Sequence, residues 1–213
     1  MSLRFTFYLG VVFIIAVYGL YSYKKLTLPY RILTILISCV FVSECSARWF
    51  AVHHESSIPP YHILILIQMI LYPYIYFTAL PAGKWLKGIT LSFALTGFIF
   101  SLCNSFFTQT FFVFPSYSIF LLSLFTVFLA MLSFYFMLEQ PVDKSPLKVP
   151  LFWFSFGNLF FYCITFFMFG FFTPFVKRSG ALPEWAFILI FVSNIGLYSC
   201  YLVSLILNVK EKQ

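Results

Sequence analysis

Residues 30–52 read YRILTILISCVFVSECSARWFAV, and this stretch decides the fold class. It is long enough to cross a bilayer, which requires about 20 predominantly apolar residues. Two charges nevertheless lie well inside it, Glu44 and, one helical turn later, Arg48. A charge at such depth costs roughly 2.5–3.5 kcal/mol on insertion scales, so it usually faces the interior of a helix bundle and serves a function there. Glu44 and Arg48 are therefore candidate functional residues, and we expect them to form one buried ion pair.

The composition of the whole chain indicates a membrane protein. The 213 residues are 62% hydrophobic and 9% charged, whereas soluble domains carry about 25% charged residues. A helical membrane bundle can leave so much apolar surface facing lipid. The net charge of +7 does not indicate a nucleic-acid partner, because the basic residues fall in short loops between apolar runs. The expected partner of the surface is the lipid bilayer.

We predict an all-α bundle of seven transmembrane helices that forms a single transmembrane domain over residues 1–213. The spans are defined by length and by polar interruptions, because segments that are apolar nearly all round show no clear periodicity. The end of the fourth span is the least defined, since Phe111 to Phe114 are apolar. The expected spans are Phe5–Tyr23, Tyr30–Val52, Tyr61–Leu80, Leu86–Phe106, Ser116–Leu138, Pro150–Phe172 and Trp185–Val209.

The basic residues predict the orientation of the chain. One side of the bundle would carry Lys24, Lys25, Arg31, Lys84, Lys87, Lys144, Lys148, Lys210 and Lys212. The other side would carry Arg4, Lys177 and Arg178, with Arg48 at the interface. Cytoplasmic loops carry the excess of Lys and Arg, so the N-terminus is expected outside and the C-terminus in the cytoplasm. The first span lacks a signal-peptidase site and is expected to be retained.

The first three and the last three spans share a plan. In each set a basic loop follows the first span, a proline (Pro29 or Pro150) opens the second, and a run rich in Ile and Leu begins the third. This plan would fit a parallel 3+1+3 repeat, a type found in some transporters, with the fourth span as a linker. Any two sets of three apolar helices also look alike at this level, so the repeat remains one of two interpretations.

Polar residues at depth predict a cavity. Glu44, Gln68 and Asn194 all fall in the outer half or the middle of their spans, and Asn104 closes the fourth span on the same side. An outward-opening polar cavity between the second, third and seventh spans would explain this distribution, with Tyr72 near it. The alternative for the amides is a set of interhelical hydrogen bonds of about 0.6 kcal/mol each. The candidate ligand-binding residues are Glu44, Arg48, Gln68, Tyr72, Asn104 and Asn194.

The three histidines cluster around the first outer loop. His53, His54, Glu55 and His62 are residue types that bind zinc or iron. They share one short loop, however, and the chain has no other histidine. We therefore interpret them as a solvated loop and expect no metal and no cofactor; a pH response is a further option, since histidine titrates near neutral pH.

Missing signatures narrow the function. No lysine lies inside the last span for a retinal Schiff base, and the C-terminal half has no histidine for a seven-helix zinc hydrolase. The chain contains no G-x-S-x-G or H-E-x-x-H motif. The number of cysteines, five, is odd, and no CxxC pair occurs. We therefore expect the cysteines to pack as small apolar side chains, without a metal or redox role. We expect no enzymatic activity.

The sequence also resembles a group of small seven-helix membrane proteins from bacteria of the Bacteroidota type, whose activity is not established. The residues that carry the resemblance are Ser43-Glu44, Arg48, Tyr61-His62, Asn104, Phe114-Pro115-Ser116, Phe152-Trp153, Gly157 and Phe161-Tyr162. The resemblance implies a role in the bacterial inner membrane, as the sensing half of a system whose kinase is a separate chain. It implies no catalytic residues.

These observations lead to two functional hypotheses. The first is a receptor-like sensor that binds a small ligand or lipid from the outer side and signals to a separate partner, such as a histidine kinase. The second is a small-solute carrier that uses Glu44 as a proton or cation site. An intramembrane enzyme is a third hypothesis, ranked below these two.

Overall fold

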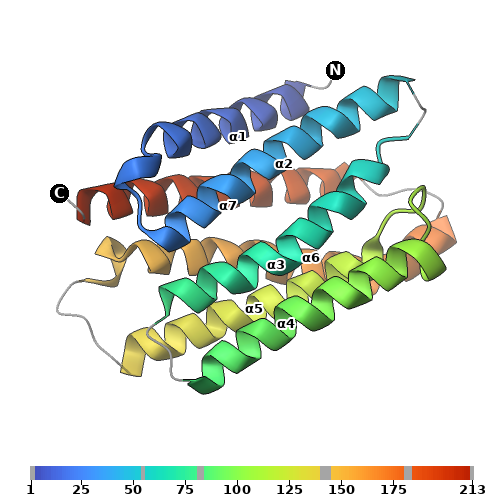
Figure 1. The fold of residues 1–213 in the computed structure, drawn as a ribbon. Coiled ribbons are helices and arrows are strands. Elements are labelled where there is room, and N and C mark those ends of the chain that lie inside the picture. Colours follow the sequence, from blue (N-terminus) through green and yellow to red (C-terminus); the bar gives the residue numbers. More distant parts are fainter. Residues whose placement is uncertain (1–2, 54–55, 81–83, 140–144, 180–183, 212–213) are drawn as a thin grey trace.

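A computed structural model describes residues 3–53, 56–80, 84–139, 145–179 and 184–211, with the backbone alone for 84 and 170–179. Within these ranges the chain forms helices and no strands, and seven of the helices are long and apolar enough to cross a membrane (Figure 1). The seven are α1 (Leu3–Tyr21), α2 (Leu28–His53), α3 (Pro59–Ala79), α4 (Lys84–Cys103), α5 (Ser116–Glu139), α6 (Pro150–Ser179) and α7 (Glu184–Glu211). Three short helices accompany them, η1 (Tyr23–Lys25), η2 (Asn104–Thr108) and η3 (Pro146–Lys148). The predicted all-α seven-helix bundle is confirmed, and the protein is a multi-pass membrane protein.

The largest difference from the expected spans is at the end of α6. This helix was expected to stop at Phe172 but continues to Ser179, so Lys177 and Arg178 belong to the helix and not to a loop. Lys and Arg are good helix formers. Their polarity therefore does not end the helix, which extends to Ser179.

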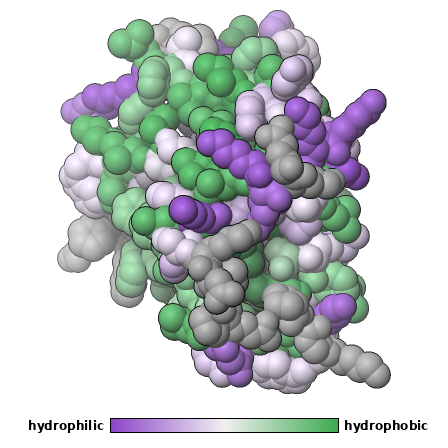
Figure 2. Space-filling view, turned by 90° about the vertical axis from the view of Figure 1, so that its left-hand side faces the viewer, coloured by the Kyte–Doolittle hydropathy of each residue, from purple (hydrophilic) through white to green (hydrophobic). Residues whose placement is uncertain are grey.

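The two ends of the bundle differ in which helices begin there. Helices α1, α3, α5 and α7 begin at one end, called here the N-terminal end, and the other end holds the last residues of α7 (Figure 1). Hydrophilic side chains gather at the C-terminal end (Figure 2). The described basic residues there are Lys24, Lys25, Arg31, Lys87, Lys148 and Lys210. Their position is compatible with a cytoplasmic C-terminal end, and the orientation itself stays a prediction.

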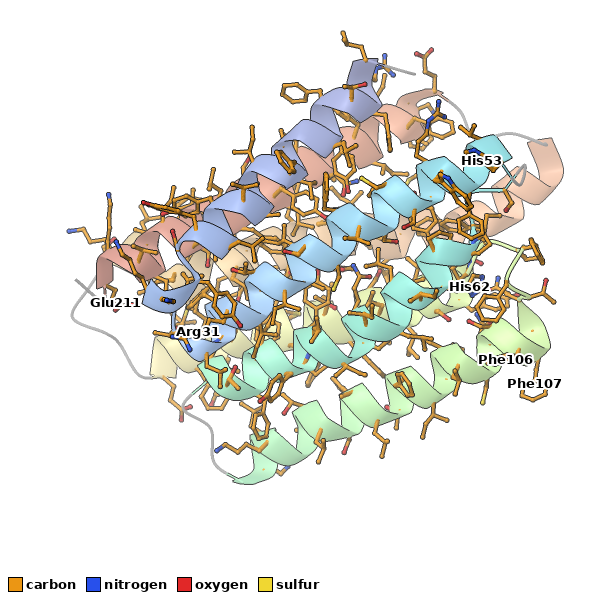
Figure 3. All side chains as sticks on the ribbon, turned by 45° about the horizontal axis from the view of Figure 1, so that its top comes forward. Arg31, His53, His62, Phe106, Phe107 and Glu211 are labelled. Atoms are coloured by element: carbon orange, nitrogen blue, oxygen red, sulfur yellow. The ribbon has the colours of Figure 1, made fainter. Side chains whose placement is uncertain are left out.

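Arg31 fixes the connection between α1 and α2 at this end (Figure 3). Its guanidinium donates hydrogen bonds to the backbone oxygens of Tyr23 at 3.1 Å, Leu26 at 2.9 Å and Lys24 at 3.2 Å. These carbonyl groups belong to η1 and its cap, where no continuing helix supplies donors. Arg31 therefore has a structural role in addition to its contribution to the positive charge of this end.

Six of the seven helices form a closed ring. The order of contacting neighbours is α1, α2, α3, α5, α6 and α7, and α7 packs back on α1. Helix α4 lies outside this ring, against α3 and α5 (Figure 1). An outer fourth helix is compatible with the 3+1+3 plan, because α1·α2, α2·α3 and α3·α5 then correspond to α5·α6, α6·α7 and α7·α1. The repeat itself stays a prediction.

Two glycines allow neighbouring helices to approach closely. A Cβ atom on Gly157 of α6 would lie 2.8 Å from Cβ of Cys200 on α7, and one on Gly19 of α1 would lie 2.7 Å from Oγ1 of Thr34 on α2. Helices in a bilayer associate through van der Waals packing, for which small interface residues are favourable. These close contacts join α6 to α7 and α1 to α2 within the ring.

Candidate functional site

The ring surrounds a partly open cavity of about 890 Å³. Each of the six ring helices contributes to its wall, and so does the connection between α4 and α5. The wall residues cluster toward the N-terminal end of the bundle. They are Tyr8, Val40, Glu44, Tyr61, Leu64, Ile65, Gln68, Tyr72, Thr108, Gln109, Val113, Phe114, Ser116, Tyr117, Ile119, Leu122, Phe161, Tyr162, Thr165, Met168, Phe169, Phe187, Ile190, Asn194, Leu197 and Tyr198.

Glu44 is the acidic residue of this wall, and two tyrosines hold its carboxylate. The hydroxyl of Tyr8 on α1 donates to Oε1 at 3.2 Å, and the hydroxyl of Tyr61 on α3 donates to Oε2 at 3.0 Å. Glu44 itself is half-buried. The carboxylate therefore lies where α1, α2 and α3 meet the cavity, with one donor on each oxygen.

The structure brings together four of the six predicted binding residues. Glu44, Gln68, Tyr72 and Asn194 all line the cavity, and they come from α2, α3 and α7 as expected. The expectation of a polar cavity needs correction, because aliphatic and aromatic side chains form most of the wall. The cavity is amphipathic, with a small number of polar groups on a largely apolar surface.

Arg48 does not pair with Glu44, and the predicted ion pair is wrong. The Arg48 side chain is exposed, and the one ion pair within 4.0 Å among the described residues joins Arg4 to Glu184, at 3.7 Å. Arg48 lies one turn nearer the end of α2, where a long side chain can extend its charge to the interface. The Arg48 guanidinium therefore stays exposed, and the hydroxyl groups of Tyr8 and Tyr61 are the hydrogen-bond partners of Glu44.

Asn104 was also predicted to be a binding residue, but it does not line the cavity. It is buried in a network that closes the connection between α4 and α5, and its Nδ2 donates to Oε1 of Gln109 at 2.9 Å and to Oγ of Ser118 at 3.0 Å. Nε2 of Gln109 donates to Oγ of Ser116 at 2.8 Å. The π-helix η2 begins at Asn104, and such turns are frequent at functional sites. Asn104 thus shapes the connection whose Gln109 reaches the cavity.

His62 is buried, so the prediction of a solvated loop is wrong for this residue. It belongs to α3, and its Nδ1 lies 2.7 Å from Oγ of Ser105 while Nε2 donates to the backbone oxygen of Val113 at 2.9 Å. The imidazole also contacts the Phe111 ring, with centroids 5.2 Å apart. His62 therefore anchors the α4–α5 connection over the cavity from the α3 side (Figure 3).

The described histidines do not converge on a metal site. His53 is exposed at the end of α2, where its ring stacks on Trp49 with centroids 4.7 Å apart and its Nδ1 lies 2.9 Å from the Trp49 backbone oxygen. No group of metal-binding side chains forms among the residues that the structure describes. His54 and Glu55 lie outside those residues.

Buried tyrosines close the cavity toward the C-terminal end. The hydroxyl groups of Tyr72 on α3 and Tyr201 on α7 lie 3.0 Å apart, and the Tyr201 hydroxyl donates to Oδ1 of Asn158 on α6. Nδ2 of Asn158 donates to the Tyr76 hydroxyl at 3.3 Å. The ring of Phe154 packs on Tyr201 and Tyr76, with centroids 5.5 Å and 5.2 Å away. A cluster of hydrogen-bonded polar groups, surrounded by aromatic rings, therefore joins α3, α6 and α7 on the C-terminal side of the cavity.

Sequence reasoning missed several residues of the site. Tyr8 and Tyr61 donate hydrogen bonds to Glu44. The Tyr198 ring packs beside Tyr8, with ring centroids 5.8 Å apart. Tyr8 and Tyr61 lie near the beginnings of α1 and α3, and tyrosines near the ends of spans are ordinary members of the aromatic belts of membrane proteins, so their positions carried no signal. Tyr198 lies in the middle of α7, where it is one of several aromatic residues in an apolar span. Gln109 reaches the wall from the connection between α4 and α5, and it was not among the predicted binding residues.

Comparison of the chain with protein-family models, with curated proteins and with solved structures finds no match.

Proposed function

We propose that the protein is a receptor-like sensor of the bacterial inner membrane, which binds a small amphipathic ligand or lipid from the outer side and signals to a separate partner such as a histidine kinase. The cavity carries this proposal. Its volume of about 890 Å³ falls in the range of roughly 300–1,000 Å³ that is typical of small-molecule sites, which are also mostly apolar with a few placed polar groups. Glu44, Gln68 and Asn194 are such groups here.

The buried tyrosine cluster supports a route for the signal. Tyr72 and Tyr198 line the cavity, Tyr72 bonds to Tyr201, and Tyr201 bonds to Asn158 in the next layer. A ligand that displaces Tyr72 would alter the contacts that hold α3, α6 and α7 together. The connections at residues 22–27, 80–83 and 140–149 are too short for a catalytic domain, so none of them supplies the output, which this proposal assigns to a partner protein at the C-terminal end.

The wall chemistry favours binding over catalysis. Among the wall residues that the structure describes there is no histidine, cysteine or lysine to act with Glu44 as a second acid, base or nucleophile. Histidine, cysteine and lysine are common partners of a carboxylate in general acid–base and nucleophilic mechanisms, and the Tyr8 and Tyr61 hydroxyls that contact Glu44 are weak acids at neutral pH. The closed aromatic layer beneath the cavity favours a sensor over a carrier, because a solute would have to displace Tyr76, Phe154 and Tyr201, which are all fully buried.

Filling the cavity tests the proposal. Leu122 lines the cavity, whereas Leu124, two residues away on α5, is exposed toward lipid. Leu122→Trp should abolish the thermal stabilisation of the purified protein by neutral amphiphiles such as tryptophol and octanol, and Leu124→Trp should leave it unchanged. Ligand binding stabilises a protein by RT ln(1 + [L]/Kd), so the stabilisation reports occupancy. Equal stabilisation of both variants, or none in the unmodified protein, would contradict a binding cavity.

A flux measurement separates the sensor from the carrier. Proteoliposomes that contain the protein should bind tritiated tryptophol without accumulating it, with or without an imposed pH gradient. Accumulation that Glu44→Gln abolishes would instead establish the carrier.

A further inference from the structure

Glu44 is the one residue with a formal charge among the described wall residues of the cavity. The other polar groups there are hydroxyl and carboxamide groups, which are neutral. No basic side chain within the described residues lies within 4.0 Å of the Glu44 carboxylate. A carboxylate in a low-dielectric site is unfavourable without a counter-charge, so a bound cation would stabilise the ionised form of Glu44.

The hydrogen bonds of Glu44 leave acceptor capacity toward a ligand. Both contacts have a tyrosine hydroxyl as the donor, one on each carboxylate oxygen. An ionised carboxylate has about four acceptor positions on its two oxygens. Tyr8 and Tyr61 therefore orient the carboxylate and occupy part of its capacity, and a donor from a bound molecule can take up the rest.

The surroundings of Glu44 suit a cation with an apolar body. The rings of Tyr8, Tyr61 and Tyr198 belong to the same region of the wall, and aromatic faces attract ammonium groups. Beyond them the wall continues with Leu64 and Ile190 and with further aliphatic and aromatic side chains. A ligand that fits both parts has a protonated amino head and an apolar aromatic or aliphatic remainder.

We infer that the cavity takes an amphipathic amine, whose ammonium group pairs with Glu44 between Tyr8 and Tyr61 and whose apolar body lies along the α3, α5 and α7 wall. This inference rests on the proposed function, because it names the chemical class of the ligand for that same cavity. It implies a preference for head-group charge in the order cation, neutral molecule, anion, at constant body shape.

Three probes with one body test this order. Tryptamine, tryptophol and indole-3-propionate share the indole ring and differ in the charge of the head group, and octylamine with octanol repeats the comparison on an aliphatic body. Binding is measured on the full chain in an uncharged detergent at neutral pH, by thermal stabilisation and by displacement of tritiated tryptophol. We expect each amine to bind at least about tenfold more tightly than its alcohol, which corresponds to about 1.4 kcal/mol, and the acid to bind most weakly.

Glu44→Gln should remove the preference for amines, so that tryptamine binds to this variant no more tightly than tryptophol does. The matched control is Glu184→Gln, the same chemical change at an exposed residue that pairs with Arg4 outside the cavity. Glu44→Asp retains the charge and should retain the preference, which covers the case in which Glu44→Gln does not fold.

The outcomes separate this inference from the proposed function. Amines that bind no better than alcohols, or a preference that survives Glu44→Gln, would overturn the amine inference. If the alcohols still bind and Leu122→Trp still blocks them, the cavity remains a binding site for neutral amphiphiles. If none of the probes binds, both proposals fall.

Discussion

Removal of the Tyr61 hydroxyl tests how the protein accommodates Glu44. Tyr61→Phe keeps the ring and deletes the donor that lies 3.0 Å from Oε2. Hydrogen bonds to charged groups contribute about 1.5–3 kcal/mol in proteins, whereas polar contacts between membrane helices average about 0.6 and reach about 1.7 kcal/mol. Because Glu44 is half-buried beside a cavity, we expect a loss of about 1–2 kcal/mol in unfolding free energy, which lies between the average for membrane helices and the middle of the range for charged groups.

Arg48 supplies the contrast. Arg48→Gln should change the unfolding free energy by less than about 0.5 kcal/mol, since substitutions of exposed residues without special contacts usually fall in that range, and the Arg48 side chain is exposed. Combined with Glu44→Gln, Tyr61→Phe should show a coupling of about 1 kcal/mol, because residues in contact couple by roughly 0.5–3 kcal/mol. Arg48→Gln should show none.

Equilibrium unfolding in mixed micelles of neutral detergent and dodecyl sulfate, followed by circular dichroism, measures these differences. The reasoning is refuted if Arg48→Gln is as destabilising as Tyr61→Phe and couples to Glu44→Gln. Simple additivity of Tyr61→Phe and Glu44→Gln would show that the hydroxyl contact contributes nothing to stability.

Three further predictions follow from the fold. Gly157→Ala places a methyl group 2.8 Å from Cβ of Cys200 and should cost about 1–3 kcal/mol in unfolding free energy through overpacking. Gly196→Ala, whose Cβ would have no neighbouring side chain or helix within 4 Å, should be neutral or stabilising, and equal effects of the two variants would contradict the close α6–α7 contact. His62→Ala should cost about 2–4 kcal/mol through a cavity and lost hydrogen bonds, while His53→Ala at an exposed position should cost less than about 0.5 kcal/mol; a reversed order in thermal unfolding would show that His62 does not anchor the α4–α5 connection. Green fluorescent protein fused to the C-terminus should fluoresce and alkaline phosphatase fused there should be inactive, and the opposite result would place the cavity on the cytoplasmic side.

The choice among amide residues shows where sequence reasoning failed. Asn104 and Asn158 are both buried in hydrogen-bonded clusters, whereas Gln68 and Asn194 line the cavity. In the sequence, all four are single amides in apolar spans. Depth along a span can be counted from its ends, but two amides at similar depth can face opposite sides of their helices. The cavity position could therefore be predicted, and the wall residues only in part.

The sequence by itself determined the number of spans and their approximate positions in the chain, because a bilayer imposes a fixed apolar length and penalises charge within it. It did not determine the partners of Glu44. The hydrogen-bond partners of Glu44 are Tyr8, 36 residues earlier in the chain, and Tyr61, 17 residues later. Arg48 on the same helix is not a partner. When helices are apolar nearly all round, no periodic pattern sets their rotation about their axes. Packing decides that rotation, through contacts such as Gly157 against Cys200 and Gly19 against Thr34, and with it decides which side chains meet at the cavity.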